Sequence, residues 1–185
     1  MIPAEITVVD FETTGSVPGW PNEPWQIGLA RLGPSGIVPG SQFSAFFRID
    51  PDRPFSPRAP GRWAAMRAEL AAAPSPLELW GEISPRLSGT PLAAHNVSTE
   101  RTVLRRLAPL ASFGPWVDSL SEARKRFPGF GSYALGDLIA EFGLGSAVEA
   151  AAPGGTWHDA LYDACASAVL LAFLRTVPDP APLLV

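Results

Sequence analysis

Residues with special chemistry are scarce in this chain of 185 residues. Cys165 is the only cysteine, which excludes an internal disulfide and a cysteine-ligated zinc cluster. The longest apolar run is far shorter than the roughly 18 residues that cross a membrane. No basic segment precedes an apolar stretch at the start, so a signal peptide is not expected. These absences argue against a secreted or membrane protein, and we expect a cytoplasmic domain.

Basic residues are almost entirely arginine, since Lys125 is the only lysine among 14 basic residues, against 18 acidic ones. The net charge of −4 disfavours loose electrostatic binding to nucleic acid. A guanidinium group suits bidentate contacts with phosphate, but GC-rich codons also favour arginine, and we prefer this compositional explanation. Two bound divalent cations would cancel the net charge.

The composition predicts a single folded domain. Hydrophobic residues make up 46% of the chain and charged residues 17%, which is enough apolar material for one core. We expect this domain to span residues 1–177 and residues 178–185 to form a flexible tail.

Three predicted strands come first, and helices then alternate with strands. Short β-branched and apolar segments predict strands at 6–11, 25–32, 43–49, 91–94 and 116–118. Helical spacing bounded by proline or glycine predicts helices at 62–72, 77–87, 99–107, 133–142 and 159–176. A three-stranded antiparallel meander extended by parallel strands implies an α/β fold, with a mixed sheet and helices on both faces.

The first group of candidate site residues ends the first predicted strand. A strand repeats every two residues, so Asp10 and Glu12 project to the same face. Two carboxylates held there form half of a site for hard divalent cations. Thr13, Thr14 and Gly15 follow and offer small side chains and backbone amides to a polar ligand. Taken alone, the pair of Asp10 and Glu12 is better explained without a binding site, as one acidic residue in a turn beside another that is solvated.

Two further groups mark the starts of predicted helices. Residues 95–100 (HNVSTE) lead into the third predicted helix, with Ser98 as a candidate N-cap. The dipole of this helix favours the charge of Glu100 without any catalytic role. In residues 156–163 (TWHDALYD), Asp159 is the expected N-cap, and His158 and Asp163 flank it so that both can face one point. Histidine exchanges a proton near neutral pH, although a lone surface histidine explains this motif equally well on its own.

Together, the three groups resemble the motifs of the DEDDh family of 3′→5′ exonucleases, which includes the proofreading epsilon subunit of bacterial DNA polymerase III and ribonuclease T. The family's first motif, Asp-x-Glu-Thr, is matched by Asp10, Glu12 and Thr13. Its third motif, His-x-Ala-x-x-Asp-Ala, is matched by residues 158–164. The resemblance runs from about residue 6 to about residue 175.

The resemblance implies a ribonuclease H-like fold and hydrolysis with two Mg²⁺ or Mn²⁺ ions, about 3.5–4 Å apart. Asp10 would bridge both ions. Glu12 and Asp163 would hold the ion that activates water, and His158 would take the proton of that water. Glu100 would complete the metal ligands. The residues implied to bind the substrate are Thr13, Thr14, Gly15, His95 and Asn96.

The second family motif, His-Asn-x-x-Phe-Asp, is altered in this chain, because Thr99 replaces the aromatic residue and Glu100 the aspartate. The extra methylene shifts the carboxylate by roughly 1.5 Å, and Mg²⁺ demands near-ideal octahedral geometry. Our hypothesis is therefore an activity that persists, but is reduced and favours Mn²⁺. Other aromatic residues would then stack on a base, and the candidates, each also explained as a core residue, are Trp20, Trp25, Phe55 and Phe130.

Three functional hypotheses follow. We favour an exonuclease that releases nucleoside monophosphates from single-stranded DNA or RNA 3′ ends, because every group needed to activate water is present. The second is a catalytically weakened nucleic-acid-binding or partner subunit of the same fold, and the third is a small phosphoester hydrolase. Both a homodimer and a polymerase-type partner remain open. Arg101, Arg105 and Arg106 either follow the substrate backbone or, as we prefer, form a solvated helix face.

Overall fold

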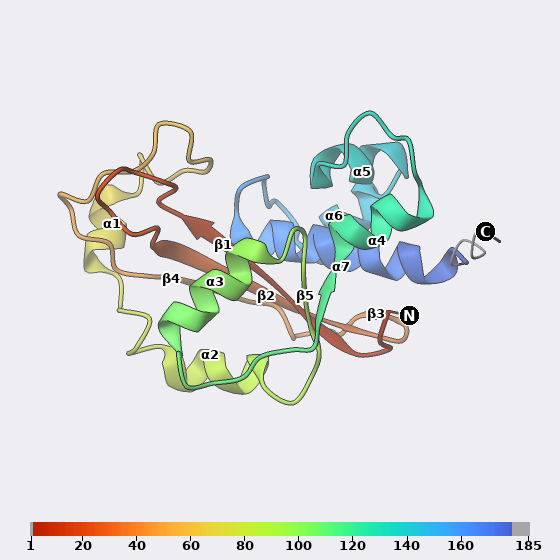
Figure 1. Cartoon of the computed structure of the whole chain (residues 1–185), viewed down its shortest axis with the longest axis horizontal. Coiled ribbons are helices and arrows are strands. Elements are labelled where there is room, and N and C mark those ends of the chain that lie inside the picture. The colour runs from red at the N-terminus through yellow and green to blue at the C-terminus, as the bar shows by residue number, and fades with distance from the viewer. Residues whose placement is uncertain (1, 179–185) are drawn as a thin grey trace.

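A six-stranded mixed sheet forms the centre of the protein in a computed structural model that describes residues 2–178 (Figure 1). The strand order is β3-β2-β1-β5-β6, and β4 also pairs with β2. β1 to β4 pair antiparallel, whereas β5 and β6 extend the sheet in parallel with β1. The strands are β1 (Ile6–Thr13), β2 (Pro24–Gly33), β3 (Gly36–Ile37), β4 (Phe43–Phe46), β5 (Leu92–Ala94) and β6 (Trp116–Asp118).

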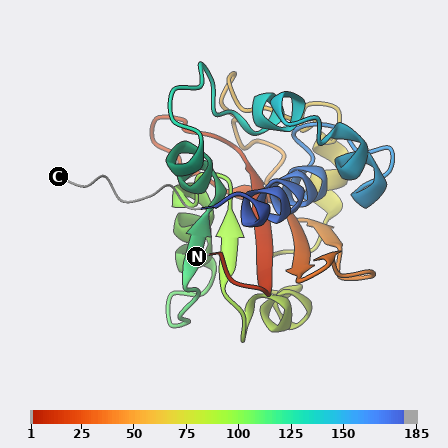
Figure 2. The same ribbon diagram turned by 90° about the vertical axis from the view of Figure 1, so that its right-hand side faces the viewer.

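Helices cover both faces of this sheet, as predicted (Figure 2). The long α7 crosses one face together with α4, α5 and α6, while α2 and α3 pack on the other. The helices are α1 (Arg67–Ala72), α2 (Trp80–Leu87), α3 (Ser98–Leu107), α4 (Ser119–Arg126), α5 (Leu135–Glu141), α6 (Gly145–Ala151) and α7 (Ala160–Thr176).

The alternation of side chains along β1 divides the core into two layers. Ile6 and Val8 pack toward α7, whereas Val9 and Phe11 pack toward α2 and α3. All four are buried, and each such side chain contributes about 1.5–3 kcal/mol relative to exposure. Because β1 is central and buried on both sides, its position is fixed more firmly than that of an edge strand.

Several elements differ from the sequence prediction. The helix expected at 62–72 begins only at Arg67, and residues 62–66 form turns instead. Two helices, α4 and α6, and the two-residue strand β3 were not predicted, because short elements carry too few apolar repeats to show a period. Pro178 is the only described residue of the predicted tail, and 179–185 lie outside the described residues.

Helix starts show one correct and one wrong capping prediction. Asp159 is the N-cap of α7, and its side chain accepts hydrogen bonds from the backbone N–H groups of Leu161 and Tyr162. Ser98 is not a cap, because α3 already begins at Ser98 and its N-cap, Val97, makes no side-chain capping bond. Cys165 is buried inside α7. Within residues 2–178, none of the helices has the length and apolarity needed to cross a membrane.

α7 begins unusually close to the sheet, and Gly28 on β2 makes this possible. A Cβ atom at Gly28 would lie 2.0 Å from the carbonyl oxygen of Ala160, far inside van der Waals contact. The start of α7 and the middle of β2 can therefore touch only because residue 28 has no side chain.

We expect Gly28→Ala to lower the free energy of unfolding by about 2–3 kcal/mol, because backbone on both sides must move to relieve the overlap. Gly81→Ala is the matched control, since a Cβ at Gly81 in α2 meets open space and alanine favours a helix by roughly 0.5–1 kcal/mol. Urea unfolding measures both. Equal stability of Gly28→Ala and wild type would contradict the close contact.

Candidate active site

β1 delivers two carboxylates to the face that α7 covers. Asp10 and Glu12 follow Ile6 and Val8 at two-residue intervals, so all four side chains share one face. In the antiparallel register, Asp10 lies opposite Gly28 and Glu12 opposite Gln26. Glu12 is 5% exposed. A carboxylate so far from water needs a compensating partner.

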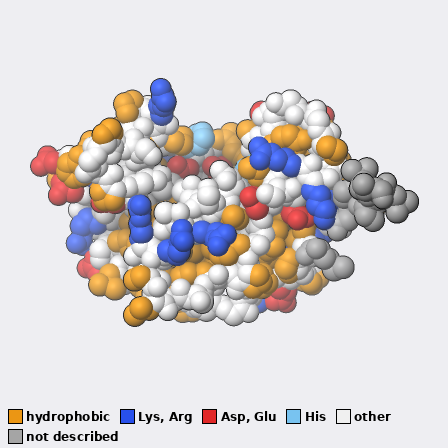
Figure 3. All heavy atoms as spheres, viewed as in Figure 1, with side chains coloured by type: hydrophobic (Ala, Val, Ile, Leu, Met, Phe, Trp, Pro, Cys, Tyr) orange, Lys and Arg blue, Asp and Glu red, His pale blue; other side chains and the backbone are white. Residues whose placement is uncertain are grey.

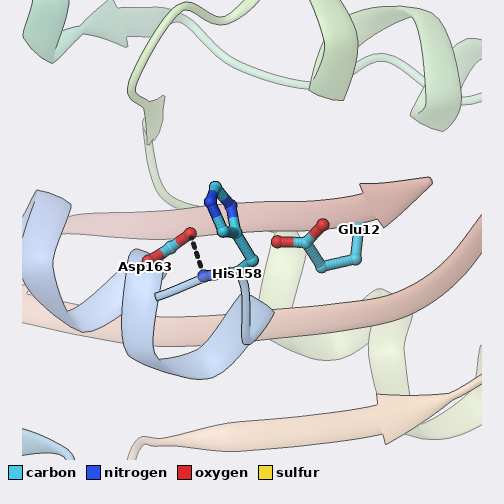
Figure 4. Close-up of side chains that lie close together, drawn as sticks. All are labelled: Glu12, His158 and Asp163. Carbon is cyan, nitrogen blue, oxygen red and sulfur yellow. Dashed lines mark hydrogen bonds between the residues drawn. The ribbon is translucent and has the colours of Figure 1, made fainter. Parts of the chain in front are cut away.

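The start of α7 brings a histidine and a third carboxylate to the same place (Figure 4). His158 directly precedes the N-cap, and Asp163 lies in the first turn of the helix. The backbone N–H of His158 donates to Asp163 Oδ2 at 3.2 Å. Ligand atoms of Glu12, His158 and Asp163 all lie within 4.8 Å of one another. This spacing suits three groups that share one small ligand.

His158 has a strained backbone, with φ of 65°. A residue with a side chain costs roughly 1–2 kcal/mol in this left-handed region, where glycine is usual. The turn nevertheless leaves the His158 side chain exposed beside two carboxylates. Figure 3 shows recessed acidic side chains next to a histidine on one face of the molecule. Strain at this position is consistent with a functional constraint.

α3 contributes a fourth carboxylate from the opposite side. Glu100 lies in its first turn and is 4% exposed. Among the charged groups that raise the pKa of Asp10, Glu100 contributes most, ahead of Asp163 and Glu12. The structure therefore brings together all five predicted catalytic residues: Asp10 and Glu12 come from β1, Glu100 from α3, Asp163 from α7, and His158 from the turn before α7.

Burial and neighbouring acids raise the pKa values of all four carboxylates. Burial raises the pKa of Glu12 to about 8, with further contributions from Asp163 and Asp159. Burial likewise raises the pKa values of Glu100 and Asp163 to about 7. The pKa of Asp10 rises well above its ordinary value, first through burial and then through the neighbouring acids. Such a cluster is unfavourable when ionised without positive charge.

The donor set fits hard divalent cations. It offers carboxylate oxygens, which Mg²⁺ and Mn²⁺ prefer, and two of these oxygens, Glu100 Oε2 and Asp163 Oδ1, are buried without a hydrogen-bond partner. Unpaired buried acceptors are costly, and bound cations would satisfy them. The residues that would hold the cations are Asp10, Glu12, Glu100 and Asp163.

Several solved structures that share this fold are nucleases, although no protein-family model and no curated protein matches the chain in sequence. The nuclease domain of 3'hExo, a DEDDh family member bound to rAMP, is 14% identical over 96% of each chain, with a TM-score of 0.72. Cell-death related nuclease 4 is 14% identical over 94% of this chain and 64% of its own, with a TM-score of 0.70. E. coli exonuclease I in complex with a dT13 oligonucleotide is 16% identical over 95% of this chain, with a TM-score of 0.70.

The chain has the fold of DEDDh-family 3′-exonucleases. The predicted resemblance and fold class are thereby confirmed at the level of structure. The chain spans 42% of the length of the exonuclease I chain and 64% of cell-death related nuclease 4.

In this DEDDh fold, the segment after β1 is tied down by a buried arginine. Thr14 Oγ1 accepts hydrogen bonds from the backbone N–H of Glu23 at 3.0 Å and from Arg53 Nη2 at 3.2 Å. Gly15 has φ of 71° and lies against Ser56. Thr13, Thr14 and Gly15 therefore form a fixed edge next to Glu12, and their contact with substrate stays a prediction.

The aromatic candidates separate by exposure. Trp25 and Phe55 are buried in one core cluster beside α1, which agrees with their alternative explanation as core residues. Trp20 is 50% exposed, and the Arg53 guanidinium lies 4.8 Å from its ring centroid. Phe130 packs against other aromatic rings near α4 and α5. Of these four side chains, Trp20 offers the most open ring.

His95 and Asn96 of the second motif make contacts within the protein. His95 Nδ1 lies 2.9 Å from Ser119 Oγ, and Nε2 lies 2.9 Å from the Tyr133 carbonyl oxygen, while burial lowers its pKa. The backbone N–H of Asn96 donates to Asp118 Oδ1 at 2.9 Å. These bonds join β5, β6 and the following segments, so they favour a structural role, and substrate binding by both residues stays a prediction.

The arginines of α3 lie on an exposed side of the helix, which fits both a solvated helix face and contact with a substrate backbone. Arg101, Arg105 and Arg106 are all exposed, and Arg106 Nη1 donates to the Asn22 carbonyl oxygen at 3.0 Å.

Sequence reasoning missed Gln26 and Gly28. They are two residues apart in a strand that is otherwise almost wholly apolar, which repeats the Asp10–Glu12 spacing on the neighbouring strand. A polar residue and a glycine at alternate positions of a buried strand were the available signal.

In the absence of divalent cations, we expect the carboxylate cluster to make the folded state less stable as pH rises. The pKa values of these carboxylates are higher in the folded state than in the unfolded state, so the folded state binds protons more tightly. The stability that this protonation adds is fully present below about pH 4.5 and is lost as pH rises to about 8. At pH 8 the free energy of unfolding of Asp10→Asn should be higher than that of wild type, because the variant removes one of the raised carboxylates, and the difference should be much smaller at pH 5.

Urea unfolding in EDTA at pH 5, 6.5 and 8 measures this difference. Adding Mg²⁺ should stabilise wild type at pH 8 and have much less effect on Asp10→Asn, because binding to the folded state adds stability. Parallel pH profiles of the two proteins in EDTA would rule out mutual repulsion in the cluster.

Proposed function

We propose that this chain is a metal-dependent 3′→5′ exonuclease that releases nucleoside monophosphates from single-stranded nucleic-acid 3′ ends. The observation that carries the proposal is the meeting of four buried or half-buried carboxylates with the exposed side chain of His158. The solved neighbours support it, since one is bound to rAMP and another to a dT13 oligonucleotide.

The roles of the residues follow from their places. Asp10, at the centre of the cluster, would contact both cations, and Glu12 and Asp163 would hold the one near His158. Glu100 would hold the second cation from α3. When bound, two cations offset the charge of the phosphodiester and make a water molecule more acidic.

His158 is the group that would accept the proton of the attacking water. Its side chain is exposed and beside Asp163 and Glu12, and imidazole accepts a proton near neutral pH. The attacking oxygen forms a bond to phosphorus while the bond to the 3′ oxygen of the preceding nucleotide breaks. The products are a nucleoside 5′-monophosphate and a chain shortened by one nucleotide.

A gel time course on 5′-labelled single-stranded DNA and RNA tests the proposal. With Mg²⁺ or Mn²⁺ we expect a ladder that shortens from the 3′ end, and none in EDTA. Asp163→Ala should reduce the rate by at least about 1,000-fold, since it removes a ligand of the reacting centre. Asp137→Ala is the matched control, because Asp137 is an exposed acid in the first turn of another helix, α5, and it should retain the wild-type rate.

Two results would overturn this proposal. Folded wild type that binds the oligonucleotides without shortening them would favour a binding or partner subunit. Cleavage of a mononucleotide ester without cleavage of any oligonucleotide would favour a small phosphoester hydrolase.

We expect Glu100→Asp to raise the rate with Mg²⁺ relative to Mn²⁺ by about threefold or more, because the shorter side chain restores the family's ligand length and Mg²⁺ tolerates displaced ligands least. Initial rates with each cation measure the ratio, and Glu69→Asp, at an exposed glutamate in α1, is the control. An unchanged ratio, or a lower one, would show that Glu100 suits Mg²⁺ as it stands.

A further inference from the structure

Gln26 is a buried polar residue beside the cluster to which no role has yet been given. It is 2% exposed and sits on β2 directly opposite Glu12. A carboxamide in such a position is costly unless both its donor and its acceptor find partners.

The Gln26 side chain makes three hydrogen bonds, and two of them hold the start of α7. Its Nε2 donates to Asp159 Oδ2 at 3.1 Å and to Ser44 Oγ at 3.2 Å. Its Oε1 accepts from the backbone N–H of Ala160 at 3.3 Å. That N–H belongs to the first turn, where a helix supplies no acceptor of its own.

Only a side chain with both a donor and an acceptor satisfies this pair of partners. An ionised Asp159 can only accept, and the Ala160 N–H can only donate. Glutamate would satisfy Ala160 but repel Asp159, and methionine would satisfy neither. The two partners also fix the orientation of the carboxamide, with Nε2 toward Asp159 and Oε1 toward Ala160.

The contact reaches His158 through one peptide bond and Asp163 through one backbone hydrogen bond. His158 directly precedes Asp159, and Asp163 donates its backbone N–H to the Asp159 carbonyl oxygen at 3.0 Å. Gly28, two residues beyond Gln26, allows the same turn of α7 to approach the strand. Because β2 pairs with β1 in fixed register, the contact of β2 with α7 also fixes the position of α7 relative to β1.

We propose that Gln26 is a positioning residue, whose carboxamide sets the places of His158 and Asp163 relative to Asp10 and Glu12. This inference rests on the proposed exonuclease function. Gln26 acts through Asp159 and Ala160 and is not among the residues predicted to bind the substrate, so its loss should affect kcat and cation affinity and leave KM almost unchanged.

The first test compares Gln26→Met with Gln42→Met. Methionine keeps the length of the side chain, and Gln42 is a matched control because its Nε2 also donates to a backbone oxygen far off in the chain, that of Ala151, which does not belong to the carboxylate cluster. For Gln26→Met we expect kcat to fall by about 10–100-fold, with KM within about twofold, and the Mn²⁺ dissociation constant to rise by about tenfold. Gln42→Met should match wild type in all three.

The Mn²⁺ constant is measured by equilibrium titration of the folded protein, without substrate. A Gln26→Met protein that is less stable but retains kcat and Mn²⁺ affinity would show a merely structural residue and overturn the inference. Wild type without nuclease activity would overturn the proposed function instead, and the Mn²⁺ titration would still decide the role of Gln26.

The second test exchanges the chemical groups of the pair. Gln26→Glu alone should be impaired like Gln26→Met, because two carboxylates then face each other. Adding Asp159→Asn should restore at least about tenfold of the loss, since the asparagine Nδ2 can donate to the glutamate and its Oδ1 still caps α7. Wild-type behaviour of Gln26→Glu, or a double variant no better than the single one, would contradict the proposed contact.

Discussion

The contact between the first turn of α7 and strand β2 is the constraint on which the candidate site depends. Gly28 allows the backbones to touch, and Gln26 bonds to the N-cap and to the first free N–H of the helix. Because β2 is paired in fixed register with β1, this contact fixes the start of α7, and with it Asp163, relative to Asp10 and Glu12, while the apolar side chains of α7 pack along the same face of the sheet. A small shift of α7 along the strand would separate the carboxylates, although each element would remain intact.

The same arrangement works against the stability of the fold. Burial and the repulsion of neighbouring acids raise the pKa values of Asp10, Glu12, Glu100 and Asp163, and His158 adopts a backbone conformation that glycine would adopt more easily. The apolar layers above and below β1 hold these groups in place despite the cost. A site built in this way gains most from cations, which supply the positive charge that the cluster itself lacks.

Much of the fold could be predicted because long, regular patterns have one physical explanation. The apolar segment ending in Asp10 and Glu12 is a central strand, and the long apolar helix after Asp159 covers it. Short elements such as β3, α4 and α6 escaped prediction, since two to eight residues carry little periodic signal and their formation depends on neighbours that pack against them. Ser98 illustrates the same limit, because its residue type suits a cap but α3 begins with it.

The sequence by itself determined which acids and which histidine belong together, since their spacing within three short motifs resembles one family's pattern. It also determined that Asp10 and Glu12 share a face, because that follows from the geometry of any strand. Only the tertiary structure decided that Glu100 reaches the cluster from α3, that His95 is occupied by Ser119 and Tyr133, and that Gln26 joins β2 to α7. These are contacts between segments far apart in the chain, and local spacing holds no information about the distances that packing imposes on them.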